Sequence, residues 1–240
     1  MTILCIETST SVCSAAICKD GKPIAQRICY EAANHAKLLP VYIDELLHLL
    51  REKGGRLDAV ALSAGAGSYT GLRIGTSTAK GICYGLQLPL IPIPTLDILC
   101  ASAVRRALSD IAPTAILCPM IDARRMEVYA ALYDAEQKPL TPTQAIVVND
   151  EEAILSTLPT AGNERPIYYF GDGAAKCQSV LAGKQWCFIA DIVPEAQDLG
   201  ALAEQAYTKG KGLTASEIAY YEPFYLKEFV AAQSHVKGLV

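Results

Sequence analysis

The spacing of hydrophobic residues divides the first 108 residues into strands and helices in a regular order. Alternating or continuous apolar runs indicate strands, and apolar residues three or four positions apart indicate helices. The Asp20-Gly21 pair between the second and third runs is a hairpin signal. The predicted elements are strands at 2–6, 12–18 and 23–30, a helix at 35–52, a strand at 57–62, a helix at 71–86, a strand at 88–93 and a helix at 95–108.

The second half repeats much of this order. Its predicted elements are strands at 115–121, 126–133 and 144–148, a helix at 150–157, a strand at 167–170, a helix at 173–182, a strand at 187–189 and a helix at 196–209. Two consecutive β-β-β-α-β-α-β-α units predict a duplicated α/β fold. This order is typical of the actin-like, Hsp70 and sugar-kinase (ASKHA) superfamily, whose two lobes are ribonuclease H-like. We expect an N-terminal lobe at 1–108 and a C-terminal lobe at 109–240, with the 196–209 helix as a candidate to pack back on the first lobe.

Composition narrows the class of protein. The 240 residues are 51% hydrophobic, which is ample for a packed core. No stretch of about 18 apolar residues is present, and the N-terminus enters a strand without a basic region or a cleavage site. We therefore expect a soluble, cytoplasmic protein. The net charge of −4 argues against a broad nucleic-acid surface, so a role with RNA would need a basic partner or a small local patch.

The nine cysteines form no Cys-x-x-Cys pair, and most of them fall inside apolar runs. Free cysteine is among the most buried residue types. Buried, reduced thiols are therefore expected here rather than zinc ligands or disulfides.

A glycine-rich block at 63–75 follows the predicted strand at 57–62 and opens the next helix. Glycines such as Gly65 and Gly67 allow close approach by another group, and the amides of 68–72 would point out of the helix N-terminus. Such a loop can hold an anion or clamp a partner. It lacks the Gly-Lys-Ser/Thr of the phosphate loop and the downstream acidic residue of the dinucleotide fingerprint.

Four segments together resemble one family. They are Ile6-Glu7-Thr8-Ser9-Thr10, the block at 63–75, Ile121-Asp122-Ala123-Arg124-Arg125-Met126-Glu127-Val128-Tyr129, and Glu222-Pro223-Phe224-Tyr225-Leu226-Lys227. They are similar to the TsaB (YeaZ) family of bacterial tRNA threonylcarbamoyladenosine biosynthesis proteins, non-catalytic paralogues of TsaD. The resemblance spans nearly the whole chain, and the Tyr-Thr-Gly-Leu-Arg-Ile-Gly run is its most specific part.

The resemblance implies that TsaD transfers a threonylcarbamoyl group to the adenosine next to the anticodon, in tRNAs reading codons that begin with adenine. TsaD-type subunits hold a metal with a helical His-x-x-x-His pair, whose imidazoles lie on one helix face. The corresponding helix here, at 95–108, has no histidine, and the three present are His35, His48 and His235. His35 and His48 are too far apart in sequence for a one-turn ligand pair, so we expect both to be ordinary surface histidines. Neither a metal nor a cofactor is expected in this chain, whereas ATP and metal are expected in partner subunits.

Several turns occupy places where superfamily relatives build a nucleotide cleft. An acidic residue and hydroxyls after the first strand would meet phosphate and magnesium, although a tight turn with local capping is the simpler interpretation. Arginines in the 122–127 turn could hold a phosphate, whereas a solvated turn is again simpler. The candidate vestigial ligand residues are Glu7, Thr8, Ser9, Gly65, Gly67, Asp122, Arg124 and Asp172.

Two helices of the first lobe favour a protein partner. Leucines and other apolar residues cover an arc of about 180° on the 35–52 helix, against about 100° for an ordinary surface helix. The 71–86 helix has small residues four apart, at Gly71, Gly75 and Ala79 and again at Gly81 and Gly85. These rows serve either internal packing or an interface. The resemblance implies pairing with TsaD, or with a second copy when TsaD is absent.

The predicted interface residues are Leu38, Leu39, Tyr42, Ile43, Leu46, Leu49, Gly71, Leu72, Gly75, Ala79 and Ile82. A charged residue at Leu46 or Ala79 is expected to disrupt pairing and leave the fold intact. In the tail from 214 onward, Tyr220, Tyr221, Phe224 and Tyr225 could pack on the second lobe or help to hold a partner, and packing is the simpler expectation.

The expected function is that of a non-catalytic subunit that stabilises and activates TsaD. TsaE is a further expected partner, and tRNA is expected to bind only through the complex. The alternatives are a small-molecule kinase, a glycoprotease-like hydrolase or a homodimeric binding module. A kinase needs magnesium ligands in both lobes, and a hydrolase needs a metal or an activated nucleophile. The sequence offers only fragments of either, and calorimetric titration with ATP and magnesium would separate the kinase from the scaffold.

Overall fold

The computed structural model describes residues 1–31, 34–108, 111–149, 152, 154 and 165–227. Its first elements are β1 Thr2–Glu7, β2 Cys13–Lys19, β3 Lys22–Cys29, α1 His35–Glu52, β4 Ala59–Ser63, α2 Tyr69–Leu86, β5 Leu90–Ile93 and α3 Thr95–Arg106. They are followed by β6 Ile116–Asp122, β7 Glu127–Ala130, β8 Tyr133–Asp134, β9 Gln144–Val147, β10 Ile167–Phe170, the 3-10 helix η1 Ala175–Cys177, β11 Trp186–Ile189, the 3-10 helix η2 Ala196–Asp198, α5 Leu199–Thr208 and α6 Ala215–Tyr220.

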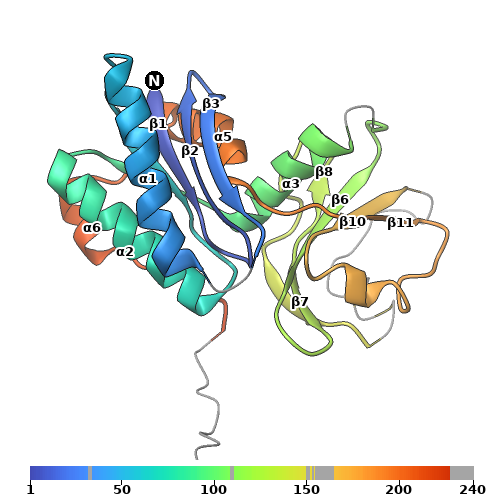
Figure 1. Ribbon diagram of the computed structural model, residues 1–240. Coiled ribbons are helices and arrows are strands. Elements are labelled where there is room, and N and C mark those ends of the chain that lie inside the picture. The colour runs from blue at the N-terminus through green and yellow to red at the C-terminus, as the bar shows by residue number, and fades with distance from the viewer. Residues whose placement is uncertain (32–33, 109–110, 150–151, 153, 155–164, 228–240) are drawn as a thin grey trace, which may run out of the picture.

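These elements form two mixed sheets side by side (Figure 1). The first sheet has the strand order β3-β2-β1-β4-β5, and the second has β11-β10-β6-β7-β9 with β8 against β6. When the strands of each half are numbered separately along the chain, with β8 left out, both sheets have the same spatial order. That order is third, second, first, fourth, fifth. The predicted duplicated ribonuclease H-like fold is confirmed.

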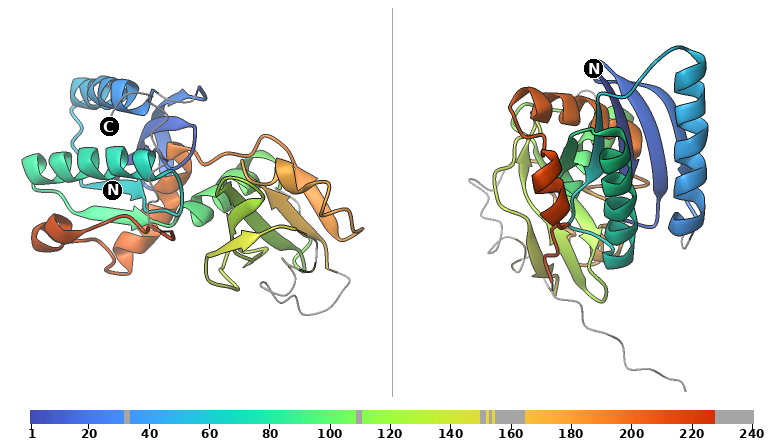
Figure 2. Two further views of the ribbon diagram at one scale, coloured as in Figure 1. Left: turned by 90° about the horizontal axis from the view of Figure 1, so that it is seen from below. Right: turned by 90° about the vertical axis from the view of Figure 1, so that its left-hand side faces the viewer.

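The first sheet is covered on both faces (Figure 2). Its hairpin turns at Asp20 and Gly21, which both have positive φ, as the Asp-Gly signal predicts. Apolar residues of α1, α2 and α6, including Leu46, Ala79 and Ile218, share one core with this sheet. On the opposite face α5 packs through Leu199 and Ala203, so this late helix lies on the first sheet.

Between the two sheets stands α3. Its Ile98 belongs to the core of the first sheet, whereas Leu96, Leu99 and Cys100 join Leu117 and other residues of the second. The boundary near residue 108 remains a prediction, because one helix contributes to the cores of both sheets.

The second half departs from the predicted elements in two places. The strand expected at 126–133 breaks between β7 and β8, opposite Pro119, which has no N–H to donate to the ladder. The helix expected at 173–182 is wrong, because only the short η1 forms there. Cys177 and Leu181 are buried four residues apart, which imitates helical spacing, while glycine and serine in the segment disfavour a helix.

The remaining predicted elements agree with the structure in kind, except that most of the helix expected at 150–157 lies outside the described residues. No helix within the described ranges is long and apolar enough to cross a membrane.

Candidate functional site

The turn after β1 is closed by its own hydrogen bonds. The Glu7 side chain is buried, and its Oε1 accepts hydrogen bonds from the backbone N–H and the hydroxyl of Ser9, both at 2.6 Å. Thr8 donates its hydroxyl to the carbonyl of Gly71 at 2.9 Å. Burial raises the pKa of Glu7 to about 7, although hydrogen bonds from Ser9 oppose the shift. Apart from Glu7 Oε2, the polar groups predicted to meet a nucleotide are therefore hydrogen-bonded within the chain itself.

The glycine block packs directly on this turn. Ser68 donates its N–H to the carbonyl of Ser9 at 2.6 Å and caps α2 by accepting from the N–H of Gly71 at 3.3 Å. A Cβ on Gly71 would overlap the Thr8 carbonyl oxygen, and Gly67 lies just as close to Ser9. The block therefore needs glycine for close contact between two loops of the same chain.

Residues 222–227, which we call the strap, cover the start of the same block. Phe224 donates its N–H to the carbonyl of Ala64 at 2.7 Å. Gly65 has a φ of +105°, and a Cβ there would overlap the Phe224 carbonyl. Farther along, the strap reaches the second sheet through an ion pair between Lys227 and Glu127.

The ligand turns predicted in the second half are also tied to each other. Asp172 accepts the N–H of Asp122 at 3.0 Å, and Asp122 accepts the N–H of Arg124 at 3.0 Å. Lys176 forms an ion pair with Asp122 and donates to the carbonyl of Glu127 at 2.7 Å. The structure thus brings Asp122, Arg124 and Asp172 together, whereas Glu7 belongs to the other sheet.

The described residues gather no group of three or more His, Cys, Asp and Glu side chains that could hold a metal ion. His35 corrects a prediction, because it is buried with Nε2 3.2 Å from the carbonyl of Val12. His48 is exposed beside Glu52, and His235 lies outside the described residues. All nine cysteines are free, and seven of them are buried, as predicted.

The predicted helix interface needs a larger correction. Leu39, Ile43 and Leu46 of α1 are buried against the sheet. Their counterparts on α2 are buried as well, namely Gly71, Leu72, Gly75 and Ala79. The wide apolar arc predicted for the 35–52 helix includes the residues that pack against the sheet. These buried residues therefore cannot face a partner. The expectation that a charge at Leu46 or Ala79 would leave the fold intact is wrong, because both are fully buried.

The outward faces of α1 and α2 carry different residues, which we call the outer face. Gly81 and Gly85 lie here, and a Cβ added to either would meet nothing within 4 Å. Tyr84 is 82% exposed and Val41 is 50% exposed. Of the predicted interface residues, the partly exposed ones are Leu38, Tyr42, Leu49 and Ile82. Val41 and Tyr84 were not among the predicted residues, since their exposure depends on the rotation of each helix against the sheet.

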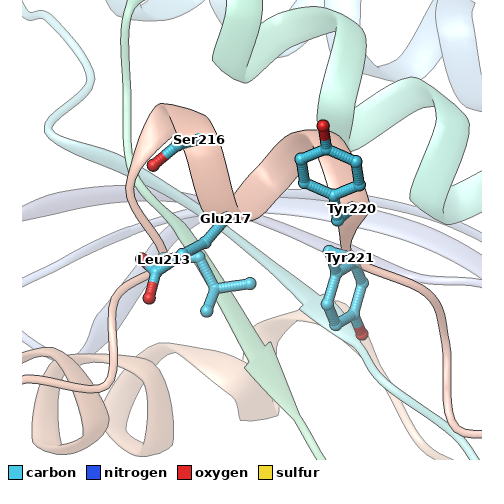
Figure 3. A pocket seen from close by; sticks show the side chains of 5 residues that line it. All are labelled: Leu213, Ser216, Glu217, Tyr220 and Tyr221. Carbon is cyan, nitrogen blue, oxygen red and sulfur yellow. The ribbon is translucent and has the colours of Figure 1, made fainter.

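Two open surface depressions flank this helical layer. One, of about 510 Å³, is lined by Leu213 and by residues of α6 and its end, where Tyr220 and Tyr221 point in opposite directions (Figure 3). The other, of about 530 Å³, lies between the C-terminal ends of α1 and α2. Neither is lined by the β1–β2 turn or by the glycine block. Packing was predicted for Tyr220, Tyr221 and Phe224, but Tyr220 is 89% exposed and Phe224 is also exposed.

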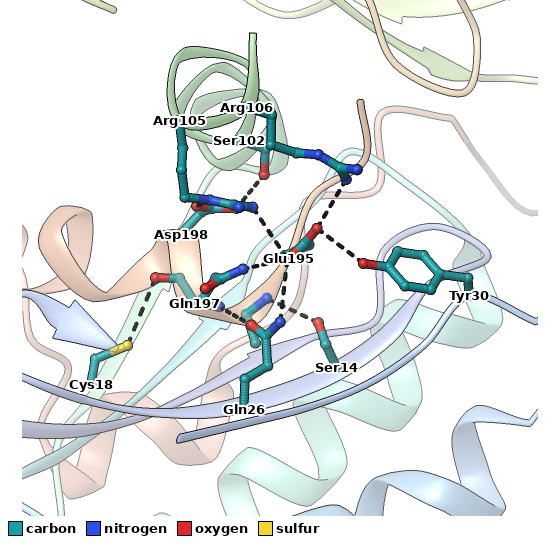
Figure 4. A network of polar contacts seen from close by, with 11 residues as sticks. Ser14, Cys18, Gln26, Tyr30, Ser102, Arg105, Arg106, Glu195, Gln197 and Asp198 are labelled. Carbon is teal, nitrogen blue, oxygen red and sulfur yellow. Dashed lines mark hydrogen bonds and ion pairs between the residues drawn. The ribbon is translucent and has the colours of Figure 1, made fainter. Parts of the chain in front are cut away.

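A polar network fixes the segment that returns from the second sheet to η2 (Figure 4). The buried carboxylate of Glu195 accepts from Tyr30 at 3.3 Å and from Arg106 at 3.1 Å. Nearby, Asp198 pairs with Arg105 at 2.6 Å. The network joins β2, β3 and α3 to the returning segment, and no sequence pattern indicated it.

Comparison with known proteins identifies the family of the chain. Residues 30–235 match the family described as TsaD: tRNA N6-adenosine threonylcarbamoyltransferase. The chain belongs to this family. Within it, the chain is 29% identical to the tRNA threonylcarbamoyladenosine biosynthesis protein TsaB of Escherichia coli (strain K12), over 96% of each chain. It is 28% identical to the protein of the same name from Bacillus subtilis (strain 168), over 95% of this chain and 94% of that one.

The solved structure of YeaZ from Pseudomonas aeruginosa is similar as well. It superposes with a TM-score of 0.76 at 26% identity, over 94% of this chain and 99% of that one. The TsaB (YeaZ) resemblance drawn from the four sequence segments is confirmed.

Proposed function

We propose that this chain is a non-catalytic subunit in tRNA threonylcarbamoyladenosine biosynthesis. It binds a TsaD-type catalytic subunit and stabilises it for threonylcarbamoyl transfer to the adenosine next to the anticodon, in tRNAs reading codons that begin with adenine. In the absence of that subunit, two copies of the chain pair through the same surface. TsaE joins as a further partner, and the ATP and metal belong to the partner subunits.

The observation that carries the proposal is the outer face of α2. Each glycine in a helix interior lowers stability by about 1 kcal/mol relative to alanine. Close packing within the chain does not offset this loss at Gly81 and Gly85, because a Cβ added at either position would meet nothing within 4 Å. Close approach of another helix would recover it. The exposed ring of Tyr84 beside them supplies the aromatic contact that is enriched at interfaces.

The filled ligand loops support a role without catalysis. The β1–β2 turn, the glycine block and the strap engage one another's carbonyls and amides. Two of the cysteine thiols are also poor nucleophiles, because burial raises the pKa of Cys13 to about 11 and that of Cys83 to about 12. Those thiols stay protonated at neutral pH.

The test is co-purification with a tagged TsaD-type subunit. Gly81→Arg places a long charged side chain on the outer face while improving helix propensity, so the fold is retained. We expect the complex to be lost, and the self-paired chain to become monomeric in sedimentation. Gln205→Arg is the matched control, because Gln205 is exposed on α5 on the opposite face of the sheet. Retention of the Gly81→Arg complex at wild-type yield would contradict the proposal.

A further inference from the structure

We propose that a strip of basic and aromatic side chains contacts tRNA directly. This basic strip starts on α2, follows the strap and ends at the turn between β6 and β7; its members are Tyr69, Arg73, Tyr225, Lys227, Arg124 and Arg125. The inference rests on the proposed function, because that function supplies the RNA. It departs from the expectation that tRNA binds only through the complex.

The first part of the basic strip is an aromatic cluster built from two distant segments, in which the two tyrosine rings are tilted by 42°. The rings of Tyr69 and Tyr225 lie with centroids 4.9 Å apart. Arg73, which is exposed, lies 5.4 Å from the Tyr69 ring centroid and donates to its hydroxyl at 3.3 Å. Aromatic rings and arginine planes of this kind accept unpaired bases.

The strap continues the basic strip to the second sheet. In Figure 1 the red end of the described chain passes beside the start of α2. Two residues after Tyr225, the Lys227 ammonium pairs with Glu127 at the start of β7. That pair places the strap beside the turn that carries Arg124 and Arg125.

The turn holds its two arginines outward. Both are exposed and have positive φ, 68° and 51°, a conformation that costs roughly 1–2 kcal/mol for each residue other than glycine. Among the described residues, neither guanidinium has a hydrogen bond or an ion pair. Asp122 holds the turn and is itself paired with Lys176, so its charge does not satisfy the arginines.

The charge balance of the basic strip favours a polyanion. Its nearby carboxylates Asp122 and Glu127 are each paired with a lysine, which leaves Asp172 and Glu222 against three arginines. An acidic chain of net charge −4 thereby gains a local basic surface. The basic strip spans both sheets, so a single phosphate or nucleotide would use only one end, whereas an RNA strand can use its phosphates and bases together.

The test measures binding of a fluorescein-labelled anticodon stem-loop RNA, with adenosine next to the anticodon, by anisotropy. The measurement uses the chain alone and the chain co-purified with a TsaD-type subunit. Arg124→Gly with Arg125→Gly removes two charges where glycine suits the positive φ. We expect about tenfold weaker binding, and a slope of log affinity against log salt reduced by about 1 to 2. Arg73→Gln should weaken binding about threefold from the other end.

The matched control is Lys209→Gln with Lys211→Gln, which removes two exposed charges beyond α5. The inference is overturned if the control weakens RNA binding as much as the arginine pair does, or if the arginine pair leaves affinity and salt slope unchanged in both preparations. If no version of the chain, wild type included, co-purified with the TsaD-type subunit, the proposed function would be refuted instead. The two failures can be told apart, because RNA binding by the chain alone is measured separately.

Discussion

At the scale of single residues, Glu7 is a carboxyl group placed where its charge is unfavourable. One oxygen accepts both hydrogen bonds from Ser9, while the other, Oε2, has no partner. A buried carboxylate oxygen without a partner favours the protonated form. The Glu7 carboxyl group is therefore about half neutral near pH 7.

Replacing Glu7 by glutamine is expected to change how stability depends on pH. The folded-state pKa of about 7 lies above the ordinary value of 4.5. Glu7 therefore contributes its full stabilisation below pH 4.5 and loses about 3 kcal/mol as pH rises through 7. The Glu7→Gln variant does not undergo this loss. The free energy of unfolding of the variant, relative to that of the wild type, should therefore rise by about 3 kcal/mol between acidic and alkaline pH. Urea unfolding at several pH values measures it, and a difference that stays constant with pH would contradict the assignment.

At the scale of elements, α2 uses its two rows of small residues for different purposes. Gly71 lies against the Thr8 carbonyl, whereas Gly81 faces open space. Gly71→Ala should therefore destabilise the chain by about 1–3 kcal/mol, because a backbone carbonyl must move. Gly81→Ala should stabilise it by about 1 kcal/mol while weakening the proposed pairing. Denaturant midpoints of the two variants measure this, and equal shifts of the same sign would show that the rows are equivalent.

The element scale also shows what sequence reasoning can reach. The 3.6-residue period placed α1 at the bounds that the structure gives, and the Asp20-Gly21 signal fixed the first hairpin. The short α6 was not predicted, since its six residues carry too little periodicity to stand out. The part of α1 that faces the sheet could not be predicted either, because its apolar arc includes both the buried Leu46 and the partly exposed Leu49. Only the sheet beneath decides between them.

At the scale of the whole molecule, the described residues show two connections between the halves besides α3. The strap links the end of β4 to β7, and Glu195 with Asp198 links the returning segment to the first sheet and α3. Both depend on residues more than 80 positions apart, such as Tyr30 and Glu195. Sequence patterns act over a few residues, so neither connection could be predicted from them.

The Glu195 network is expected to stabilise the returning segment at neutral pH. Burial opposes the charge, but two glutamine amides and two guanidinium groups hold the pKa of Glu195 below its ordinary value. A lowered pKa gives stability that is present above the unfolded value of 4.5 and is lost as pH falls through the folded value. Glu195→Gln should therefore cost about 1–3 kcal/mol at pH 7 and less in acid.

Hydrogen exchange gives that prediction a local readout. The N–H of Ala196 is donated to the hydroxyl of Ser14 at 2.9 Å, and that of Gln197 to the side chain of Gln26 at 2.9 Å. If Glu195 positions this segment, exchange of these two amides should accelerate in Glu195→Gln while the amides of β1 keep their protection. Glu136→Gln is the control, because that glutamate is exposed on the second half. Equal acceleration throughout the first sheet would mean that Glu195 supports global stability only, and unchanged exchange would remove its role as a connection between the halves.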